Sequence, residues 1–452
     1  MWLFIILALI LFGALGIVYL ANRIGKFSFV KRLSGGRKLI KYIISYTILA
    51  CAVVNVYLFV GMINTVIVII HLMVFWIISD GLGKLIGKIV DKYGLFAKDD
   101  IQSADGVKCT DGAQNIDGMQ NTNGAQSTDG AQNIDGMQNT NGAQSTDGMQ
   151  CTTGMQYADS SDTDSNTTKR KIYYEGIIAI VFTGIYMTIG WALAHNVRAT
   201  YYTVSSDKCK GNIRIVQIAD SHIGSTFSGK EFNKHIEVIQ SENPDVVLVT
   251  GDYVDDETSK QDMIDACKAL GKLRTTYGVY YSFGNHDGGY YPKEYRGYDG
   301  EDMVRELENN NVTVLQDESV LIDDRFYIIG RKDRSFGRSK KGTKDATVRM
   351  TPKELTKELD KDKYMIVLDH QPSEYADLKA AGVNLVFSGH THAGQLFPFN
   401  RMGQWLGIDE MSYGLRENDD TVYVVTSGIS NWEIKFRTGC RAEYVVLDVV
   451  GK

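Results

Sequence analysis

Four long apolar runs constrain this chain more than any other feature of its sequence. They cover residues 1–20, 43–60, 63–78 and 177–193, and none contains Asp, Glu, Lys or Arg. A helix rises about 1.5 Å per residue, so about 20 residues cross the ~30 Å hydrocarbon core of a bilayer. One such run is compatible with a buried helix of a soluble core, but four in one chain predict transmembrane helices. We expect three of them in a membrane domain over residues 1–93 and the fourth within residues 172–195.

Basic residues predict the orientation of these helices. Seven Lys and Arg lie between the first and second runs, and further basic residues follow the third run and precede the fourth. Four alternating spans place all of these groups on one side, and cytoplasmic loops are enriched in Lys and Arg. We therefore expect a multi-pass protein of the cell membrane, with the chain after about residue 197 outside the cytoplasm.

Residues 81–93 carry a different pattern from the spans. Lys84, Lys88 and Lys92 are spaced four apart between apolar side chains. This spacing predicts an interfacial amphipathic helix on an anionic leaflet. A simple continuation of the third span explains it equally well.

A hexapeptide repeat separates the third run from the fourth. Within residues 99–168, Gly recurs every six positions from Gly112 to Gly154, and residues 111–128 are repeated unchanged at 129–146. A β-helix would need an apolar side chain in every turn, whereas this position is usually Thr. The composition predicts a disordered, low-complexity linker. The linker contains eleven Asp and one Lys, so it accounts for the acidic net charge of -6, and the rest of the chain is mildly basic.

After residue 212, short apolar strand-like runs end repeatedly in polar residues. The five polar motifs are Asp220-Ser221-His222, Gly251-Asp252, Gly284-Asn285-His286-Asp287, His370, and Gly389-His390-Thr391-His392. In α/β proteins the carboxyl ends of strands gather at one edge, where ligands bind. Five of the eight histidines of the chain stand in these motifs.

The residue types in the motifs point to divalent metal ions. Carboxylate, imidazole and amide groups suit first-row ions, whereas the six cysteines lack the C-x-x-C spacing of structural zinc sites. Two ions ~3.5–4 Å apart can share a carboxylate and clamp a phosphoryl oxygen. We therefore expect a site for two divalent ions, Mn, Fe or Zn, that can bind a phosphoryl group between them.

The five motifs resemble the D-x-H, G-D, G-N-H-[DE], H and G-H-x-H signature of the calcineurin-like metallophosphoesterase superfamily. The resemblance covers about residues 212–450 and implies a four-layered α/β/β/α sandwich within a domain over residues 200–452. Its implied chemistry is in-line attack on phosphorus by a hydroxide that two ions activate.

The resemblance also assigns roles to single residues. Asp220, His222 and His392 would hold one ion, and Asn285, His370 and His390 the other, with Asp252 bridging both. His286 resembles the catalytic histidine that stabilises and protonates the leaving oxygen, with Asp287 orienting it.

Residues 392–395, 413–415 and 425–428 resemble a bacterial membrane-associated branch of this superfamily. That branch includes enzymes that cleave the pyrophosphate of UDP-diacylglucosamine. Ala393 stands where the branch usually has Gly, and Ser427 stands where an Arg is expected. Because Ser427 removes an expected phosphate contact, the substrate stays open.

Two classes of function remain compatible with the sequence. The first is a membrane-anchored phosphodiesterase or pyrophosphatase acting on a cell-envelope or lipid-linked substrate, with phosphomonoesterase activity as the alternative. The second is a catalytically silent, membrane-tethered binding or sensory module, which the complete set of ligand residues disfavours. A nucleic-acid enzyme is disfavoured by the expected outside location and by the lack of a basic stripe interleaved with aromatic residues. The oligomeric state is left open.

Two further features allow alternative interpretations. Residues 331–349 hold eight basic residues and two acidic ones, which fits a cap loop over a phosphorylated substrate or lipid headgroups, or a solvated surface loop. Cys209 and Cys440 each precede a predicted terminal strand of the domain, so they are either disulfide-bonded or separate thiols.

Overall fold

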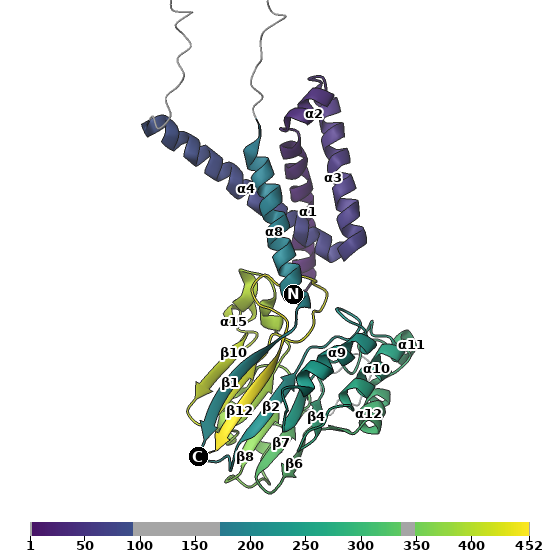
Figure 1. Cartoon of the computed structure of the whole chain (residues 1–452), viewed down its shortest axis with the longest axis vertical. Coiled ribbons are helices and arrows are strands. Elements are labelled where there is room, and N and C mark those ends of the chain that lie inside the picture. Colours follow the sequence, from purple (N-terminus) through teal and green to yellow (C-terminus); the bar gives the residue numbers. More distant parts are fainter. Residues whose placement is uncertain (1, 94–171, 336–348, 452) are drawn as a thin grey trace, which may run out of the picture. The chain divides into compact units, whose positions relative to one another are not determined.

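The computed structural model of this 452-residue chain describes residues 2–93, 172–335 and 349–451 (Figure 1). The predicted repeat linker, residues 99–168, lies outside the described residues. The chain divides into two compact units. One comprises Met1–Ala21, Tyr46–Phe75 and Ala179–Lys452, and the other comprises Asn22–Ser45 and Trp76–Ile178.

All four predicted apolar runs are helical. The helices are α1 (Trp2–Ile24), α3 (Lys38–Val60), α4 (Met62–Tyr93) and α8 (Tyr174–His195), with a short α2 (Ser28–Leu33) between the first two. Within the described residues, α3, α4 and α8 are long and apolar enough to cross a membrane. In α1 the described side chains begin at Ile10, and Ile10–Ile24 is an apolar helix that is shorter than these three candidate spans. Three candidate spans are therefore established.

Helix α4 corrects the predicted boundary at residue 81. Its 32 residues run without a break to Tyr93, so residues 81–93 are a continuation of the third span and not a separate interfacial helix. Extending an existing helix adds a hydrogen bond per residue, whereas starting a new helix requires a costly nucleus. At about 1.5 Å per residue α4 is ~48 Å long, which exceeds the ~30 Å hydrocarbon core.

A polar cluster joins three segments of the smaller unit. Arg23 at the end of α1 forms an ion pair with Asp80 of α4, with 2.8 Å between Nε and Oδ2. Tyr173, just before α8, donates its hydroxyl to Asp80 Oδ1 at 2.8 Å and accepts from Trp76 Nε1 at 3.0 Å. The basic end of α1 and the beginning of α8 therefore meet at the same turn of α4.

Two mixed six-stranded sheets build the rest of the larger unit. The first has the order β1-β12-β2-β3-β4-β5. Its strands are β1 (Arg198–Ser206), β2 (Ile213–Ile218), β3 (Val246–Thr250), β4 (Val279–Ser282), β5 (Val312–Val314) and β12 (Glu443–Gly451). The second has the order β10-β11-β9-β8-β7-β6. Its strands are β6 (Glu318–Ile322), β7 (Phe326–Gly330), β8 (Tyr364–Leu368), β9 (Leu385–Ser388), β10 (Gly414–Asn418) and β11 (Thr421–Val425).

The strands that carry the motifs are parallel neighbours. β2, β3 and β4 run parallel in the first sheet, and β8 and β9 run parallel in the second. β3, β8 and β9 are buried along their whole length, as expected for strands covered on both faces. Parallel neighbours end at the same edge, so the loops after them converge. The α/β class is confirmed, and all five motif strands form where the sequence predicts them.

Apolar packing explains how the sheets stack. One core lies between the two sheets and includes Ile215 of β2 and Ile366 of β8. A second core packs the first sheet against α9 (Gly229–Gln240), α10 (Lys260–Leu270) and α12 (Gly300–Asn309). A third lies on the other face of the second sheet and includes residues of α13 (Pro352–Leu355) and α14 (Tyr375–Ala380). Shorter helices are α11 (Lys293–Arg296), η3 (His392–Gly394), η4 (Phe399–Arg401) and α15 (Met402–Trp405).

The loop between β11 and β12 contacts the membrane helices of the same unit. Asn64 of α4 is buried; it donates to the Glu433 carbonyl at 2.9 Å and accepts from the Lys435 N–H at 2.8 Å. The Arg437 N–H donates to the Gly190 carbonyl of α8 at 2.9 Å. This loop is therefore held at two candidate membrane spans by hydrogen bonds to the Asn64 side chain and to the Gly190 carbonyl.

Candidate metal centre

The motif loops turn sharply where the strands end. Asp220, Asp252, His390 and His392 all have positive φ, between 48° and 72°. Gly251 has a φ of 79°, and a Cβ at this position would lie 2.5 Å from the Gly284 nitrogen. Only glycine therefore allows the loops after β3 and β4 to approach this closely. The tight turns point the motif side chains into one space.

Asp220, His222 and His392 form the first cluster. Their ligand atoms all lie within 4.8 Å of one another, and all three residues are buried. His392 Nε2 is 3.7 Å from Asp220 Oδ1. The structure thus brings together the three residues that were predicted to hold one ion.

Asp252, His370 and His390 form the second cluster, again with ligand atoms within 4.8 Å of one another. Asp252 Oδ2 lies 3.1 Å from His370 Nε2 and 3.9 Å from His222 Nε2 of the first cluster. One carboxylate oxygen is therefore close to both groups of ligands. This geometry matches the bridging role predicted for Asp252.

Asn285 completes the predicted ligand set through its oxygen atom. Its Nδ2 donates to the Tyr290 hydroxyl at 3.0 Å, while its Oδ1 is buried with no hydrogen-bond partner. A buried acceptor without a partner costs ~1–3 kcal/mol, and a bound cation would remove this cost. His222 Nε2 and His370 Nε2 are also buried without hydrogen-bond partners. The residues therefore fit a pair of divalent ions.

In His370 and His222, a neighbouring hydrogen-bond acceptor decides which ring nitrogen remains available for a metal ion. His370 Nδ1 lies 2.8 Å from the Thr250 carbonyl, which can only accept, so Nδ1 donates and Nε2 is left for a metal ion. Asp255 Oδ2 lies 3.4 Å from His222 Nδ1 and favours a proton on that atom. Both rings thus present Nε2 to the centre.

The site is buried, and burial has opposite effects on its acids and bases. Burial raises the pKa of Asp220 to about 6 and lowers the pKa of His390 to about 4. Burial also disfavours the charged form of Asp252, but the adjacent His370 holds the pKa of that carboxyl well below its usual value. Against the effect of burial, the carboxylates Asp252 and Asp220 in turn raise the pKa of His370 well above its usual value, so a metal ion that binds this ring must displace a proton from it.

His286 and Asp287 differ in what they contact. The His286 ring lies beside the rings of Tyr290 and Trp432, with centroids 5.2 and 5.4 Å away, and its Nδ1 is buried without a hydrogen-bond partner. The Asp287 carboxylate instead accepts from the main-chain N–H groups of residues 252, 253, 254 and 284. Asp287 was predicted to orient His286, but its contacts in the structure hold the Asp252 loop against the Gly284 loop.

Residues 213–394 match the family of calcineurin-like phosphoesterases. This part of the chain is a calcineurin-like phosphoesterase domain. A Campylobacter jejuni protein named as a metallophosphoesterase is 28% identical over 293 residues, which cover 64% of this chain and 73% of that protein. A bovine transmembrane protein with a metallophosphoesterase domain is 29% identical over 242 residues, or 52% of each chain. The present chain thus spans about half the length of the bovine relative.

A solved structure from Thermus thermophilus aligns with 47% of this chain and 88% of its own, with a TM-score of 0.31 and 11% identity.

Arg437 lies beside the candidate metal centre, and the motifs did not reveal it. Its guanidinium is fully buried, donates to the Ser427 carbonyl at 2.7 Å and lies 3.2 Å from His392 Nδ1. A cationic side chain therefore stands beside Ser427, where an arginine was expected. Arg437 is ten residues further along the chain and outside all five motifs, so no local pattern identifies it. Tyr290 and Asp255 were missed for the same reason.

The basic stretch of residues 331–349 contributes to packing at both of its ends. Arg331 Nη1 and Arg349 Nη1 each lie 2.8 Å from an oxygen of Asp369, and all three side chains are buried. These two arginines are therefore internal partners of a buried carboxylate. Residues 336–348 of this stretch lie outside the described residues.

Cys209 and Cys440 are both free thiols. In the parallel pair β1–β12, Arg198 pairs with Glu443 and Ser206 with Gly451. Cys440 precedes the first of these pairs and Cys209 follows the last. The nine-residue strands separate the two ends by ~30 Å, which excludes a disulfide.

Proposed function

We propose that this chain is a membrane-anchored, dimetal phosphoesterase that hydrolyses a phosphodiester or pyrophosphate bond of a cell-envelope or lipid-linked substrate. The observation that carries this proposal is the position of Asp252. One of its oxygens lies within 4 Å of a histidine from each cluster, at 3.1 and 3.9 Å. Two ligand groups that share a carboxylate are the arrangement of two-metal hydrolases.

Each group of residues has a part in this chemistry. Divalent ions bound here supply Lewis acidity that activates water and neutralises charge on a phosphoryl oxygen. Asp220, Asp252 and Asn285 would supply oxygen ligands to these ions. The half-buried His286, beside the His222 ring with centroids 5.3 Å apart, is placed to give a proton to the leaving oxygen.

The test uses the full-length protein in detergent, because its catalytic domain is hydrogen-bonded to its membrane helices. The protein is stripped with chelator and reloaded separately with Mn²⁺, Fe²⁺ or Zn²⁺. Hydrolysis of bis-p-nitrophenyl phosphate, p-nitrophenyl phosphate and pyrophosphate is then measured, together with the metal content per chain. Asp252→Asn is compared with Asp377→Asn, which changes an exposed carboxylate on α14.

We expect two ions per chain and metal-dependent turnover of the diester or pyrophosphate. Turnover should fall by at least ~100-fold in Asp252→Asn and stay unchanged in Asp377→Asn. Preferred turnover of p-nitrophenyl phosphate would identify a phosphomonoesterase instead. Two bound ions without turnover of any of these compounds would contradict the proposal and support a catalytically silent binding module.

We also propose that the phosphoesterase domain lies outside the cytoplasm and that the chain between the third and fourth apolar runs lies on the cytoplasmic side. The basic residues between and beside the apolar runs support this orientation. Alkaline phosphatase and green fluorescent protein are fused separately to the C-terminus at Lys452. An active phosphatase with a dark fluorescent protein supports the orientation, and the reverse pair of results excludes it.

A further inference from the structure

A cavity of about 650 Å³ lies beside the loop that carries the metal ligand His392. Its wall includes Ala393, the residue next to this ligand, and Ser412. The Ser412 carbonyl accepts a hydrogen bond from the Thr391 hydroxyl at 2.6 Å. The cavity and the metal centre therefore share a loop, and its volume is in the range of small-molecule sites.

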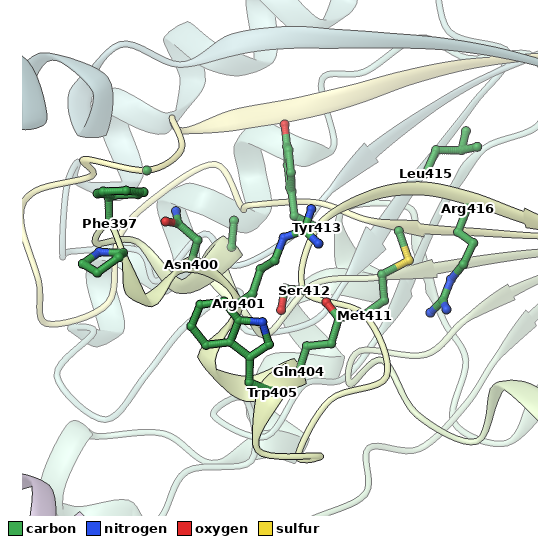
Figure 2. A pocket seen from close by; sticks show the side chains of 13 residues that line it. Phe397, Asn400, Arg401, Gln404, Trp405, Met411, Ser412, Tyr413, Leu415 and Arg416 are labelled. Carbon is green, nitrogen blue, oxygen red and sulfur yellow. The ribbon is translucent and has the colours of Figure 1, made fainter.

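The wall of this cavity combines positive charge with apolar surface. Arg401 and Arg416 are its charged side chains, and no Asp or Glu is among the described residues that line it. Figure 2 shows Arg401 extending toward Tyr413, with Phe397 and Arg416 toward opposite ends of the cavity. Such a wall is complementary to a ligand that has an anionic group and an apolar chain.

Residues 397–408, which we call the apolar arm, form one rim of the cavity. The arm contains η4 and α15 and exposes six large apolar side chains. Phe397 is 61% exposed, Trp405 67% and Leu406 61%. Single exposed apolar residues are common, but a group of six in twelve residues marks a surface that binds an apolar partner. Exposed Trp and Phe beside Arg are typical of segments at a membrane interface.

The apolar arm begins where the domain contacts its own membrane helices. Leu396, the residue before the arm, packs against a cluster that contains Val60, Ile67 and Met187 of α3, α4 and α8. The Phe397 N–H donates to the Thr438 hydroxyl at 3.0 Å. The arm is therefore continuous with an apolar surface formed by the candidate membrane spans. Because these spans would lie in the lipid bilayer, we take the bilayer as the apolar partner of the arm.

From these observations we propose that the cavity and the apolar arm bind the apolar chain of a phosphate ester that is carried by a lipid of the surrounding membrane. The chain lies along Phe397 and Trp405, Arg401 and Arg416 contact the anionic group, and the ester reaches the metal centre past Ala393. This inference rests on the proposed phosphoesterase function and names the class of substrate for the same site.

The test measures binding separately from hydrolysis. Ethyl phosphate and octyl phosphate are titrated calorimetrically into metal-loaded full-length protein in detergent, and the heat of titration into empty micelles is subtracted. The variants are Phe397→Ser/Trp405→Ser and Arg401→Gln, with Val238→Ser as the matched control. Val238 is a 52% exposed apolar residue of α9 and lies outside the cavity wall.

In the wild type and in Val238→Ser we expect octyl phosphate to bind at least about tenfold more tightly than ethyl phosphate, because each buried methylene strengthens binding several-fold. In Phe397→Ser/Trp405→Ser the two esters should bind almost equally. Arg401→Gln should weaken both by a similar factor. Equal affinities in the wild type, or a chain-length preference that the double variant retains, would overturn the proposal.

A second measurement addresses the source of the ligand. Phosphatidate is added to nanodiscs that contain the full-length protein, and its effect on hydrolysis of bis-p-nitrophenyl phosphate is compared between the wild type and Phe397→Ser/Trp405→Ser. Inhibition in the wild type that the double variant loses supports access from the bilayer, and equal inhibition in both excludes it. A wild type that hydrolyses no ester but still prefers octyl phosphate would contradict the proposed enzymatic function and leave the lipid site standing.

Discussion

At the scale of single residues, hydrogen bonds decide which atom each side chain leaves for a metal ion. The Tyr290 hydroxyl accepts from Asn285 Nδ2, so the oxygen of that amide faces the centre. The Thr250 carbonyl has the same effect on His370, whose Nε2 is left free. These second partners decide the orientation of ligands that the motifs identify only by residue type.

Removal of the Tyr290 hydroxyl should weaken metal binding without unfolding the domain. Tyr290 is 46% exposed, so Tyr290→Phe removes little packing. We expect ~10-fold weaker affinity for the more weakly bound ion, because the Asn285 amide loses the acceptor that orients it. Affinity is measured by titration against a competing chelator. Tyr291→Phe, at a 61% exposed neighbour, is the control, and equal affinities in the two variants would refute the orienting role.

At the scale of secondary-structure elements, ion pairs join segments that are distant in the sequence. Arg331 after β7 and Arg349 before α13 both contact Asp369, which follows β8 and precedes the candidate metal ligand His370. The same arginines also lie 2.8 and 3.2 Å from the Glu374 carboxylate at the beginning of α14. This network holds the loop after β8 in place.

Arg349→Met should therefore be strongly destabilising. Removing one partner of a buried ion pair costs about 3–5 kcal/mol, because the remaining charge stays desolvated. Here Asp369 keeps Arg331, so we expect a loss toward the lower end of this range in the free energy of unfolding. Lys353→Met, which changes an exposed basic residue on α13, should have little effect. Denaturant unfolding in detergent measures both variants, and similar midpoints would show that the network is dispensable.

A second ion pair crosses between two strands of the first sheet. Arg214 of β2 and Asp448 of β12 are register partners, with 2.8 and 2.7 Å between the two pairs of nitrogen and oxygen atoms. The hydrogen bonds from Arg214 lower the pKa of the Asp448 carboxyl below its usual value. A lowered pKa in the folded state stabilises the protein above the unfolded-state pKa, which is ~3.9 for Asp.

The stabilising effect of Asp448 should depend on pH. Metal-depleted wild type and Asp448→Asn are compared by their melting temperatures between neutral and acid pH. We expect a constant difference above about pH 5 that disappears as the pH falls through the lowered pKa of Asp448. The effect should be less than ~1 kcal/mol, because both side chains are more than a third exposed. A difference that grows on acidification would contradict the assignment, and Asp420→Asn, in an exposed turn, is the control.

At the scale of the whole molecule, the candidate metal centre lies between loops of the two sheets. Asp220 follows β2 and Asp252 follows β3 in the first sheet, while His370 and His390 follow β8 and β9 in the second. Both carboxylates are buried. Ions bound between these loops would therefore stabilise the packing of the two sheets as well as the site itself.

Chelation should lower the melting temperature of the full-length protein. A ligand at ~1,000 times its dissociation constant stabilises the folded state by ~4 kcal/mol, and each kcal/mol corresponds to roughly 2–4 °C in a domain of this size. We expect a decrease of ~8–16 °C on chelation, reversed by Mn²⁺ or Zn²⁺. In Asp252→Asn the decrease should be much smaller. Unchanged melting of the wild type on chelation would show that ions do not link the sheets.

The apolar helices, the α/β class, the five motif strands and the residues of the two candidate metal clusters could all be predicted from the amino-acid sequence. These properties depend on short patterns of hydrophobicity and residue type, which are local in the chain. The continuation of α4 through residue 93 was not determined in this way, since its lysine spacing fits an interfacial helix equally well.

The surroundings of these candidate ligands could not be predicted in the same way. The Tyr290 hydroxyl that bonds Asn285 is only five residues away, but it lies outside the motif. Arg437 beside His392, the main-chain N–H groups that bond Asp287 from the Asp252 loop, and the apolar arm next to the candidate metal centre depend on contacts between distant segments. Such contacts leave no periodic pattern, because only the packing of the two sheets and the loops between them brings these residues within bonding distance.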